Sequence, residues 1–224
     1  PDRLIPFCLI DPRYGNHPDT ALSRLLAEYK ARGCKGLGEL LPKLDFDDPR
    51  CLNLYRQAGA AGLPVLFDMM DGPYSYGLCD DYGLPKLKHA LKTCPDTVFI
   101  GHGPTFWAEI SADVPPDRRA GYPPGPVKSG GAVPRLLRQY PNLWADISAG
   151  SGHNALVRDP AFGLAFLDEF QDKLMFGTDS CVRSDVNGVW RTVALLRQIE
   201  TDQSLASGAL EKLKWRNCAR LLNL

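Results

Sequence analysis

Short apolar runs recur along this chain, and between them apolar residues are spaced at helical intervals. Glycine, proline or polar residues bound the runs, which predict strands at 4–10, 34–41, 64–70, 97–103, 143–148 and 174–176. Continuous apolar runs of this length are typical of strands buried on both faces of a parallel sheet. Ligands of α/β folds bind at the carboxyl ends of such strands, so the residues that end the runs are candidates for chemistry.

The segments between the runs predict helices. Leu22, Leu25 and Leu26 show the helical spacing of apolar residues, and Gly33 follows as a stop signal. By the same signals we expect helices at 21–31, 48–61, 84–93, 133–140 and 162–170, and from 189 to the C-terminus. The alternation of strands and helices predicts an α/β fold, a parallel sheet covered by helices, in a single domain over residues 1–224.

Residues 105–131 form the longest stretch without a periodic pattern, and they are rich in proline and glycine. A loop of this length within a compact domain is usually functional or disordered. Because it follows His102 directly, one interpretation is a lid or a substrate wall anchored by apolar residues, in which Trp107 contacts the substrate. The other interpretation is a disordered excursion.

Composition narrows the classes of partner. Basic and acidic residues both number 26, so the formal net charge is zero and no basic field exists to attract nucleic acid or an anionic membrane. No apolar run approaches the ~20 residues that span a bilayer, and the chain opens without a signal-peptide pattern. The seven cysteines are scattered and contain no C-x-x-C pair, which fits a reducing compartment. We therefore expect a cytoplasmic protein that acts on a small molecule.

Ionisable residues lie at or near the carboxyl ends of the predicted strands: Glu39, Asp68, His102, Asp146 and Asp179. Carboxylates and neutral imidazoles are ligands for hard and borderline divalent metals, and the same groups perform general acid–base catalysis. A single aspartate after a strand is also a common helix cap, and a single histidine is often a hydrogen-bonded core residue. The repetition across strands favours a site.

Other functional motifs give less support. The chain contains no G-x-G-x-x-G, no P-loop and no G-x-S-x-G, so nucleotide binding and a serine nucleophile elbow lack a sequence signal. His17 and His89 are predicted to be surface residues. His153 falls in a predicted loop beyond a strand end, where it either contacts substrate or is solvated. We expect three residues to contact substrate: Trp107, His153 and Asp146.

Four segments together resemble the amidohydrolase-related family of metal-dependent TIM-barrel hydrolases and decarboxylases. They are Phe-Ile-Gly-His-Gly at 99–103, Leu-Trp-Ala-Asp-Ile-Ser at 143–148, Leu-Met-Phe-Gly-Thr-Asp at 174–179 and Asn-Cys-Ala-Arg-Leu-Leu at 217–222. The resemblance covers nearly the whole chain from residue 6. Each motif is moderately specific by itself, and their order and spacing carry the resemblance.

The resemblance implies roles for four residues. Asp179 matches a metal ligand that also acts as general base, and His102 matches the histidine that polarises water or substrate and helps to bind metal. Asp68 stands where family members commonly have a histidine ligand, and Glu39 stands where some related hydrolases carry a glutamate ligand. The implied cofactor is a divalent ion, zinc first, with manganese or iron as alternatives.

The chain departs from the family at its beginning. It contains no His-x-His pair, which family members carry on their first strand, and it has six predicted strands against the eight of a complete barrel. We therefore expect an incomplete (β/α)8 barrel of about six units that starts as if at strand three. An unclosed barrel exposes two strand edges, which favours a homo-oligomer.

Three functions remain open at this point. The first is metal-dependent hydrolysis of a small molecule through an activated water. The second is non-oxidative decarboxylation on the same scaffold. The third is a non-catalytic α/β remnant with a vestigial site, which the missing His-x-His pair favours.

Overall fold

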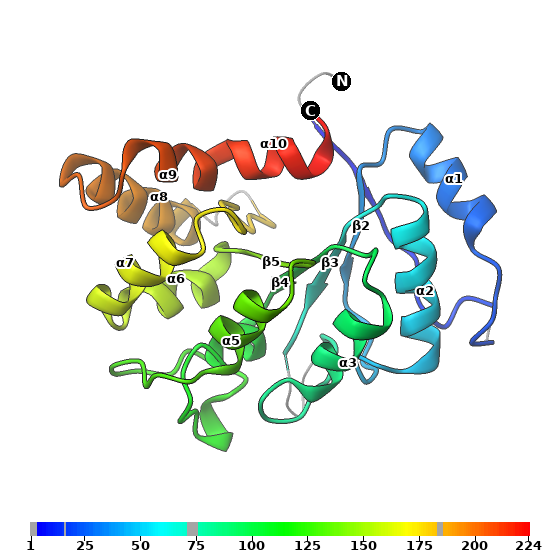
Figure 1. Ribbon diagram of the computed structural model, residues 1–224, viewed down its shortest axis with the longest axis horizontal. Helices are drawn as coiled ribbons and strands as arrows, with labels where there is room; N and C mark the ends of the chain where they lie inside the picture. The colour runs from blue at the N-terminus through cyan, green and yellow to red at the C-terminus, as the bar shows by residue number, and fades with distance from the viewer. Residues whose placement is uncertain (1–3, 16, 71–75, 183–185) are drawn as a thin grey trace.

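The computed structural model describes residues 4–15, 17–70, 76–182 and 186–224, without side-chain detail for 186–189. One sheet of six parallel strands organises them (Figure 1), in the order β1 to β6. The strands are β1 Phe7–Cys8, β2 Gly36–Leu40, β3 Val65–Asp68, β4 Phe99–His102, β5 Leu143–Asp146 and β6 Leu174–Met175. All six lie within the predicted runs, so the predicted parallel α/β fold is confirmed.

Strands that follow one another in the chain are also neighbours in the sheet. Asp68 on β3 is in register with His102 on β4, and Asp146 on β5 is in register with Met175 on β6. Because every pair is parallel, all the carboxyl ends lie at one edge of the sheet. The polar residues that end the strands are therefore brought side by side.

The helices also follow the prediction, with ends that differ by only a few residues. The predicted helices correspond to α1 Ser23–Ala31, α2 Pro49–Ala60, α3 Pro85–Thr93, α5 Ala132–Gln139 and α7 Pro160–Glu169. The predicted C-terminal helix is divided into α8 Val186–Thr201, α9 Ser207–Glu211, a π-helical turn Lys212–Arg216 and α10 Asn217–Leu222. Among the described residues, no helix is both long enough and apolar enough to cross a membrane.

Local sequence explains where α2 begins. The Asp48 carboxylate accepts a hydrogen bond from the backbone N–H of Arg50 at 2.9 Å, and Pro49 occupies the first turn. An aspartate cap satisfies one of the free N–H groups of a helix start, and proline there lacks an N–H that would otherwise need a partner. The same Asp-Pro pair begins α7, where Asp159 accepts from the N–H of Phe162.

Two segments predicted to be irregular are helical. Helix α4, Pro104–Ala108, lies within the expected long loop, and helix α6, Ala149–Val157, carries His153; a 3-10 turn at Pro116–Arg118 is the other regular piece of the loop. Helix α4 is buried on every side, so its sequence has no amphipathic period. Helix α6 contains two glycines, and packing outweighs their low helix propensity: a Cβ on Gly152 would lie 2.7 Å from the Ile147 backbone.

The outer face of the sheet makes most of the core. Phe67 and Phe99 point outward beneath the helices, where the rings of Phe67 and Phe46 meet edge to face at 4.8 Å and those of Phe99 and Tyr55 at 5.1 Å. All four of these side chains are fully buried. Strand residues of the other parity face the opposite, inner side, which is the side of the polar strand ends.

The C-terminal segment lies beside β6 and continues past the sheet to α10, near the start of the chain (Figure 1). The backbone N–H of Phe176 donates to the Leu213 carbonyl at 2.8 Å, and the Asn217 side-chain amide donates to the Leu174 carbonyl at 2.7 Å. The guanidinium of Arg220 lies 5.0 Å from the centre of the Trp144 ring. These contacts hold helix α10 against the sheet.

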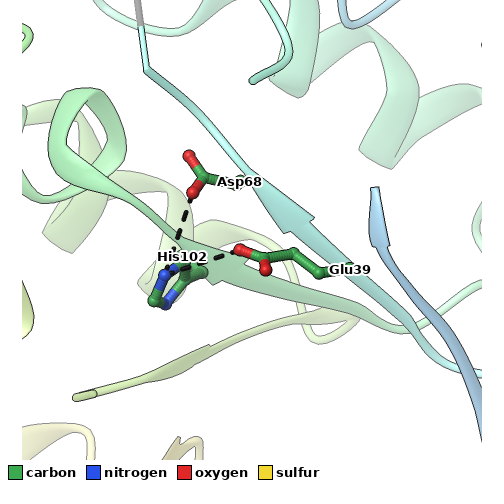
Figure 2. Close-up of side chains that lie close together, drawn as sticks. All are labelled: Glu39, Asp68 and His102. Atoms are coloured by element: carbon green, nitrogen blue, oxygen red, sulfur yellow. Dashed lines mark ion pairs between the residues drawn. The ribbon is translucent and has the colours of Figure 1, made fainter. Parts of the chain in front are cut away.

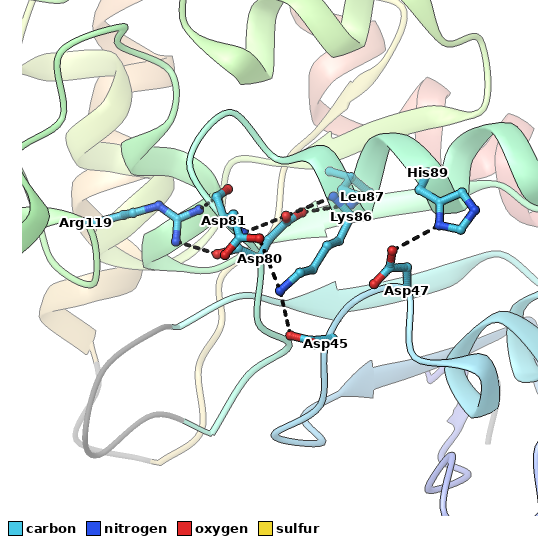
Figure 3. A network of polar contacts seen from close by, with 8 residues as sticks. All are labelled: Asp45, Asp47, Asp80, Asp81, Lys86, Leu87, His89 and Arg119. Atoms are coloured by element: carbon cyan, nitrogen blue, oxygen red, sulfur yellow. Dashed lines mark hydrogen bonds and ion pairs between the residues drawn. The ribbon is translucent and has the colours of Figure 1, made fainter.

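A buried polar network fixes the segment between β3 and α3 (Figure 3). The Asp80 carboxylate accepts hydrogen bonds from the backbone N–H groups of Asp81, Lys86 and Leu87 at 2.8–2.9 Å. The Arg119 guanidinium donates to Glu109 at 2.8 Å and to the carbonyls of Asp80 and Asp81 at 2.8 and 2.9 Å. The network joins the long connection after α4 to the start of α3.

Asp80 should make stability depend on pH. Burial raises its pKa from 3.8 to about 6, although the three N–H groups oppose this shift. Between pH 3.8 and about 6, the folded protein therefore holds a proton that the unfolded chain has released. This contribution to stability is fully present below pH 3.8 and is lost as pH rises through about 6. Replacing Asp80 with Asn should remove up to about 3 kcal/mol of that pH dependence, measured by urea unfolding across the window.

The matched control is Asp81→Asn, because Asp81 is the exposed neighbour in the same turn. It should leave the pH dependence of unfolding as it is in the wild type. Identical pH profiles for the wild type and Asp80→Asn would contradict the role given to Asp80.

Candidate metal centre

Three side chains from neighbouring strands meet at the carboxyl edge of the sheet (Figure 2): Glu39, Asp68 and His102. One ligand atom from each lies within 4.8 Å of the others. The Nε2 atom of His102 is 3.6 Å from Oε1 of Glu39 and 3.9 Å from Oδ2 of Asp68. Of the four residues predicted to bind metal, Glu39, Asp68 and His102 therefore lie together in the structure.

The backbone brings them together in two ways. Asp68 and His102 are register partners, so their side chains leave the sheet on the same face. The register between β2 and β3 shifts between Leu37 and Leu40, where Gly38 has a φ of 139°. This irregularity places the Glu39 side chain on the face of the other two.

The far side of the His102 ring is held by β5. Its Nδ1 atom lies 3.0 Å from Oδ1 of Asp146 and 3.2 Å from the Ser148 hydroxyl. Ser148 also donates to Asp146 through its backbone N–H at 3.0 Å and through its hydroxyl. A carboxylate at one ring nitrogen fixes the tautomer and the ring orientation, so Nε2 is presented to Glu39 and Asp68.

Burial and charge shift the pKa values of these groups. Burial raises the pKa of Glu39 to about 7 and also raises the pKa of Asp68, while His102 opposes both shifts. Burial disfavours the charged form of His102, but Asp146, Glu39 and Asp68 outweigh this effect and raise its pKa to about 10. The site therefore stabilises positive charge at the imidazole.

The chemistry of these residues fits a divalent metal ion. Oδ1 of Asp68 is buried and has no hydrogen-bond partner among the described residues, although Asp68 is only 3% exposed. A buried carboxylate oxygen without a partner is costly, and a cation beside it removes that cost. Two carboxylates and one imidazole provide the oxygen and nitrogen donors that zinc and manganese accept.

Asp179 lies at the rim of the site. It follows β6, has a φ of 52°, and its side chain is exposed, in contrast to the three clustered residues. It lines the same cavity as Glu39 and His102 but is not a member of the group whose ligand atoms lie within 4.8 Å. Asp179 therefore lies at the solvent-exposed edge of the cavity, outside the cluster of three residues.

The three residues expected to contact substrate occupy different environments. Trp107 is 2% exposed, and its indole N–H donates to the Asp146 carbonyl at 3.2 Å, so it supports the site from the core. His153 lies on α6, half-buried, with Nδ1 lacking a partner among described residues, and it is not among the residues that line the cavity. Asp146 does line the cavity, but its carboxylate is engaged with His102 and Ser148.

Ser148 is a functional residue that sequence reasoning did not single out. The available signal was the Asp-x-Ser spacing at the end of β5, where a serine hydroxyl can reach back to the aspartate two residues earlier. His17 and His89, predicted to be surface residues, are both exposed.

The centre opens into a cavity of about 260 Å³ on the inner side of the sheet. Its polar lining residues are Glu39, His102, Asp146, Ser148, Thr178 and Asp179. No lysine or arginine is among the described residues that line it. Among the described lining residues, three carboxylates therefore lie at one end of the cavity, and the imidazole of His102 is the group there that can carry positive charge.

Comparisons with known proteins identify the family and the fold. A family model described as amidohydrolase (Amidohydro_2) matches residues 1–224. The comparison with curated proteins found no match.

Three solved structures illustrate the similarity in fold. An uncharacterized TIM-barrel protein from Bordetella bronchiseptica has a TM-score of 0.59 and 20% identity, over 100% of this chain and 68% of that chain. An amidohydrolase from Burkholderia multivorans with bound zinc has a TM-score of 0.59 and 16% identity, over 93% and 72%. A dihydroxybenzoic acid decarboxylase from Polaromonas sp. JS666, with manganese and 2-nitroresorcinol bound, has a TM-score of 0.51 and 16% identity, over 93% and 66%. The six-stranded sheet is thus a partial barrel.

The glycine after His102 should be required by the centre. Gly103 has a φ of 98°, and a Cβ there would lie 2.3 Å from Oδ1 of Asp68. We expect Gly103→Ala to lower the free energy of unfolding by about 1–3 kcal/mol and to displace the Asp68 carboxylate. Chemical denaturation of the variant measures the loss.

Gly33→Ala is the matched control, because Gly33 has a φ of 94° and no atom within 4 Å of the added Cβ. It introduces the same backbone strain without the clash. A loss of stability in Gly103→Ala no larger than that in Gly33→Ala would show that the contact with Asp68 is not limiting.

Proposed function

This chain belongs to the amidohydrolase family, and on that premise we propose that it hydrolyses a small molecule with the aid of a divalent metal ion. The observation that supports the proposal best is the convergence of Glu39, Asp68 and His102, which each offer a ligand atom within 4.8 Å of the others. These three residues would hold the ion. A divalent ion in such a site supplies Lewis-acid activation of water and of a carbonyl group.

The side chains divide the remaining work. Asp146 and Ser148 hold the His102 ring, so that its Nε2 atom stays directed into the centre. We expect Asp179, at the rim, to take the proton from the attacking water as general base, a role that needs solvent access. Glu39 and Asp68 hold negative charge beneath the reacting group.

Zinc is the first candidate for the ion, and manganese or iron is the alternative. The Burkholderia multivorans amidohydrolase binds zinc and the Polaromonas decarboxylase binds manganese. Glu39 and Asp68 outnumber the single imidazole here, and a donor set rich in carboxylate moves the preference toward the harder manganese.

Hydrolysis is the first candidate because the family model that matches the whole chain is described as amidohydrolase. Decarboxylation remains the second candidate because of the likeness in fold to a dihydroxybenzoic acid decarboxylase.

Metal content tests the proposal and the alternative of a vestigial site. After loading with zinc or manganese and gel filtration, the purified protein should contain close to one ion per chain by elemental analysis. Asp68→Ala should lower the affinity at least about tenfold, because it removes a ligand. Asp45→Ala removes an exposed carboxylate outside the three-residue cluster, and this variant should bind the metal as the wild type does. Absence of bound metal in the wild type would favour the alternative of a non-catalytic protein with a vestigial site.

The role of Asp179 has a separate test. Asp179→Asn should retain the metal but reduce the hydrolysis of p-nitrophenyl esters by about 10²–10⁴-fold, the usual effect of removing a general base. Loss of the metal together with activity would identify Asp179 as a ligand instead. Unchanged activity with the metal retained would remove Asp179 from the reaction.

A further inference from the structure

We propose that Tyr122 and Tyr76 form a wall at the solvent side of the metal centre, and that their hydroxyl groups donate hydrogen bonds to an oxygen atom of the substrate. The two tyrosines come from the segments that follow β4 and β3. The inference rests on the proposed function and adds a property of the substrate, which is a second oxygen group beyond the one that reaches the ion.

Tyr122 lies against the start of α6. A Cβ on Gly150 would lie 2.8 Å from the Tyr122 hydroxyl oxygen and 3.0 Å from its ring carbon Cζ. Gly150 is two residues after Ser148, whose hydroxyl lies 3.2 Å from Nδ1 of His102. Because glycine has no side chain, the phenol can approach the end of β5, beside the residues that hold the imidazole.

The loop that carries Tyr122 is attached to the C-terminal half of α6. The side chains of Asn154 and Arg158 both donate to the Pro123 carbonyl at 3.1 Å. Arg158 also donates to the Pro126 carbonyl at 3.4 Å. These hydrogen bonds hold the loop in place directly after Tyr122, and they favour the substrate wall among the interpretations that the sequence allowed for this segment.

Tyr76 approaches the centre from the segment after β3. Two residues later, the backbone N–H of Leu78 donates to the Asp68 carbonyl at 2.8 Å, and a Cβ on Gly77 would lie 2.8 Å from the same oxygen. The chain therefore returns to Asp68 directly after Tyr76. Because Tyr76 is 49% exposed and Tyr122 is 55% exposed, both phenols are accessible to a ligand.

The charges of the centre act on both phenols. Burial raises the pKa of Tyr122, and the carboxylates of Asp179 and Asp68 raise it further. Burial also raises the pKa of Tyr76, and Asp68, Glu39 and Asp179 add to this shift. Both phenols therefore keep their protons at neutral pH. Ionised carboxylates only accept hydrogen bonds, so among these groups the two phenols supply the donors that an oxygen atom of a ligand needs.

Two hydroxamates of equal size test the hydrogen bond, because they chelate zinc through the same head group. 3-Carbamoylpropanohydroxamate ends in an amide, and 4-methylpentanohydroxamate has an isopropyl group of the same shape in its place. In calorimetric titrations of the zinc-loaded protein, Tyr122→Phe should weaken binding of the amide about two- to tenfold, because the variant loses only a hydroxyl donor. Binding of the isopropyl compound should stay unchanged, and Tyr76→Phe should act in the same way.

Tyr82→Phe is the matched control for these variants. Tyr82 is 51% exposed, and the centre of its ring lies 4.8 Å from the Arg119 guanidinium in the network between β3 and α3. This variant should bind both compounds as the wild type does. Equal losses for the two compounds in Tyr122→Phe and Tyr76→Phe, or no loss for either compound, would overturn the inference.

Gly150→Ala tests the placement of the ring without altering Tyr122 itself. The added methyl would lie 2.8 Å from the hydroxyl oxygen, so the ring must move, and binding of the amide should weaken as in Tyr122→Phe. Gly208→Ala is the control, because no atom lies within 4 Å of its added Cβ. Unchanged binding of both hydroxamates in Gly150→Ala and in Tyr122→Phe would contradict the proposed wall.

Fluorine NMR separates this inference from the proposed function. With 3-fluorotyrosine at position 122 of the purified protein, without added metal, Asp179→Asn should shift the fluorine resonance because a nearby charge is removed. The same substitution should leave 3-fluorotyrosine at position 82 unaffected. A shifted signal in a protein that binds neither hydroxamate would count against the metal centre and support the position of the wall. An unshifted signal at position 122 would show that Tyr122 does not face the centre, and the inference would be wrong.

Discussion

Carboxylates surround the imidazole of His102 on both sides, and the candidate site depends on this arrangement. Asp146 contacts one ring nitrogen, and Glu39 and Asp68 face the other. So much buried negative charge around one imidazole is costly, because each carboxylate loses water and repels its neighbours. The raised pKa of Glu39 reflects that cost, and positive charge on the imidazole or on a bound cation lowers it.

The scaffold makes this arrangement possible through parallel register and close packing. Adjacent parallel strands deliver their last residues to one edge, and the residue after His102 must be glycine because a Cβ would meet Asp68. The aromatic core on the outer face leaves the inner face to the site. Helix α10 lines the same cavity from the side of the amino ends of the strands.

Much of this was predictable from the sequence, and what was missed has physical reasons. Runs of apolar residues located all six strands, and the polar residues that end them indicated Glu39, Asp68 and His102. Helices α4 and α6 were missed because burial and glycine erase the helical pattern. Periodicity does not encode contacts between distant segments. Such contacts bring Ser148 and Trp107 to the site, Asp179 to its rim and α10 to the cavity wall.

Anomalous diffraction from a crystal of the manganese-loaded protein tests the central claim most directly. The account predicts one strong peak within bonding distance of a Glu39 oxygen, an Asp68 oxygen and Nε2 of His102, with Asp146 still at Nδ1. A peak only at a surface group such as Asp47 and His89, or no peak in a crystal soaked in excess manganese, would contradict it. In that case the cluster would be a proton-holding network of the core.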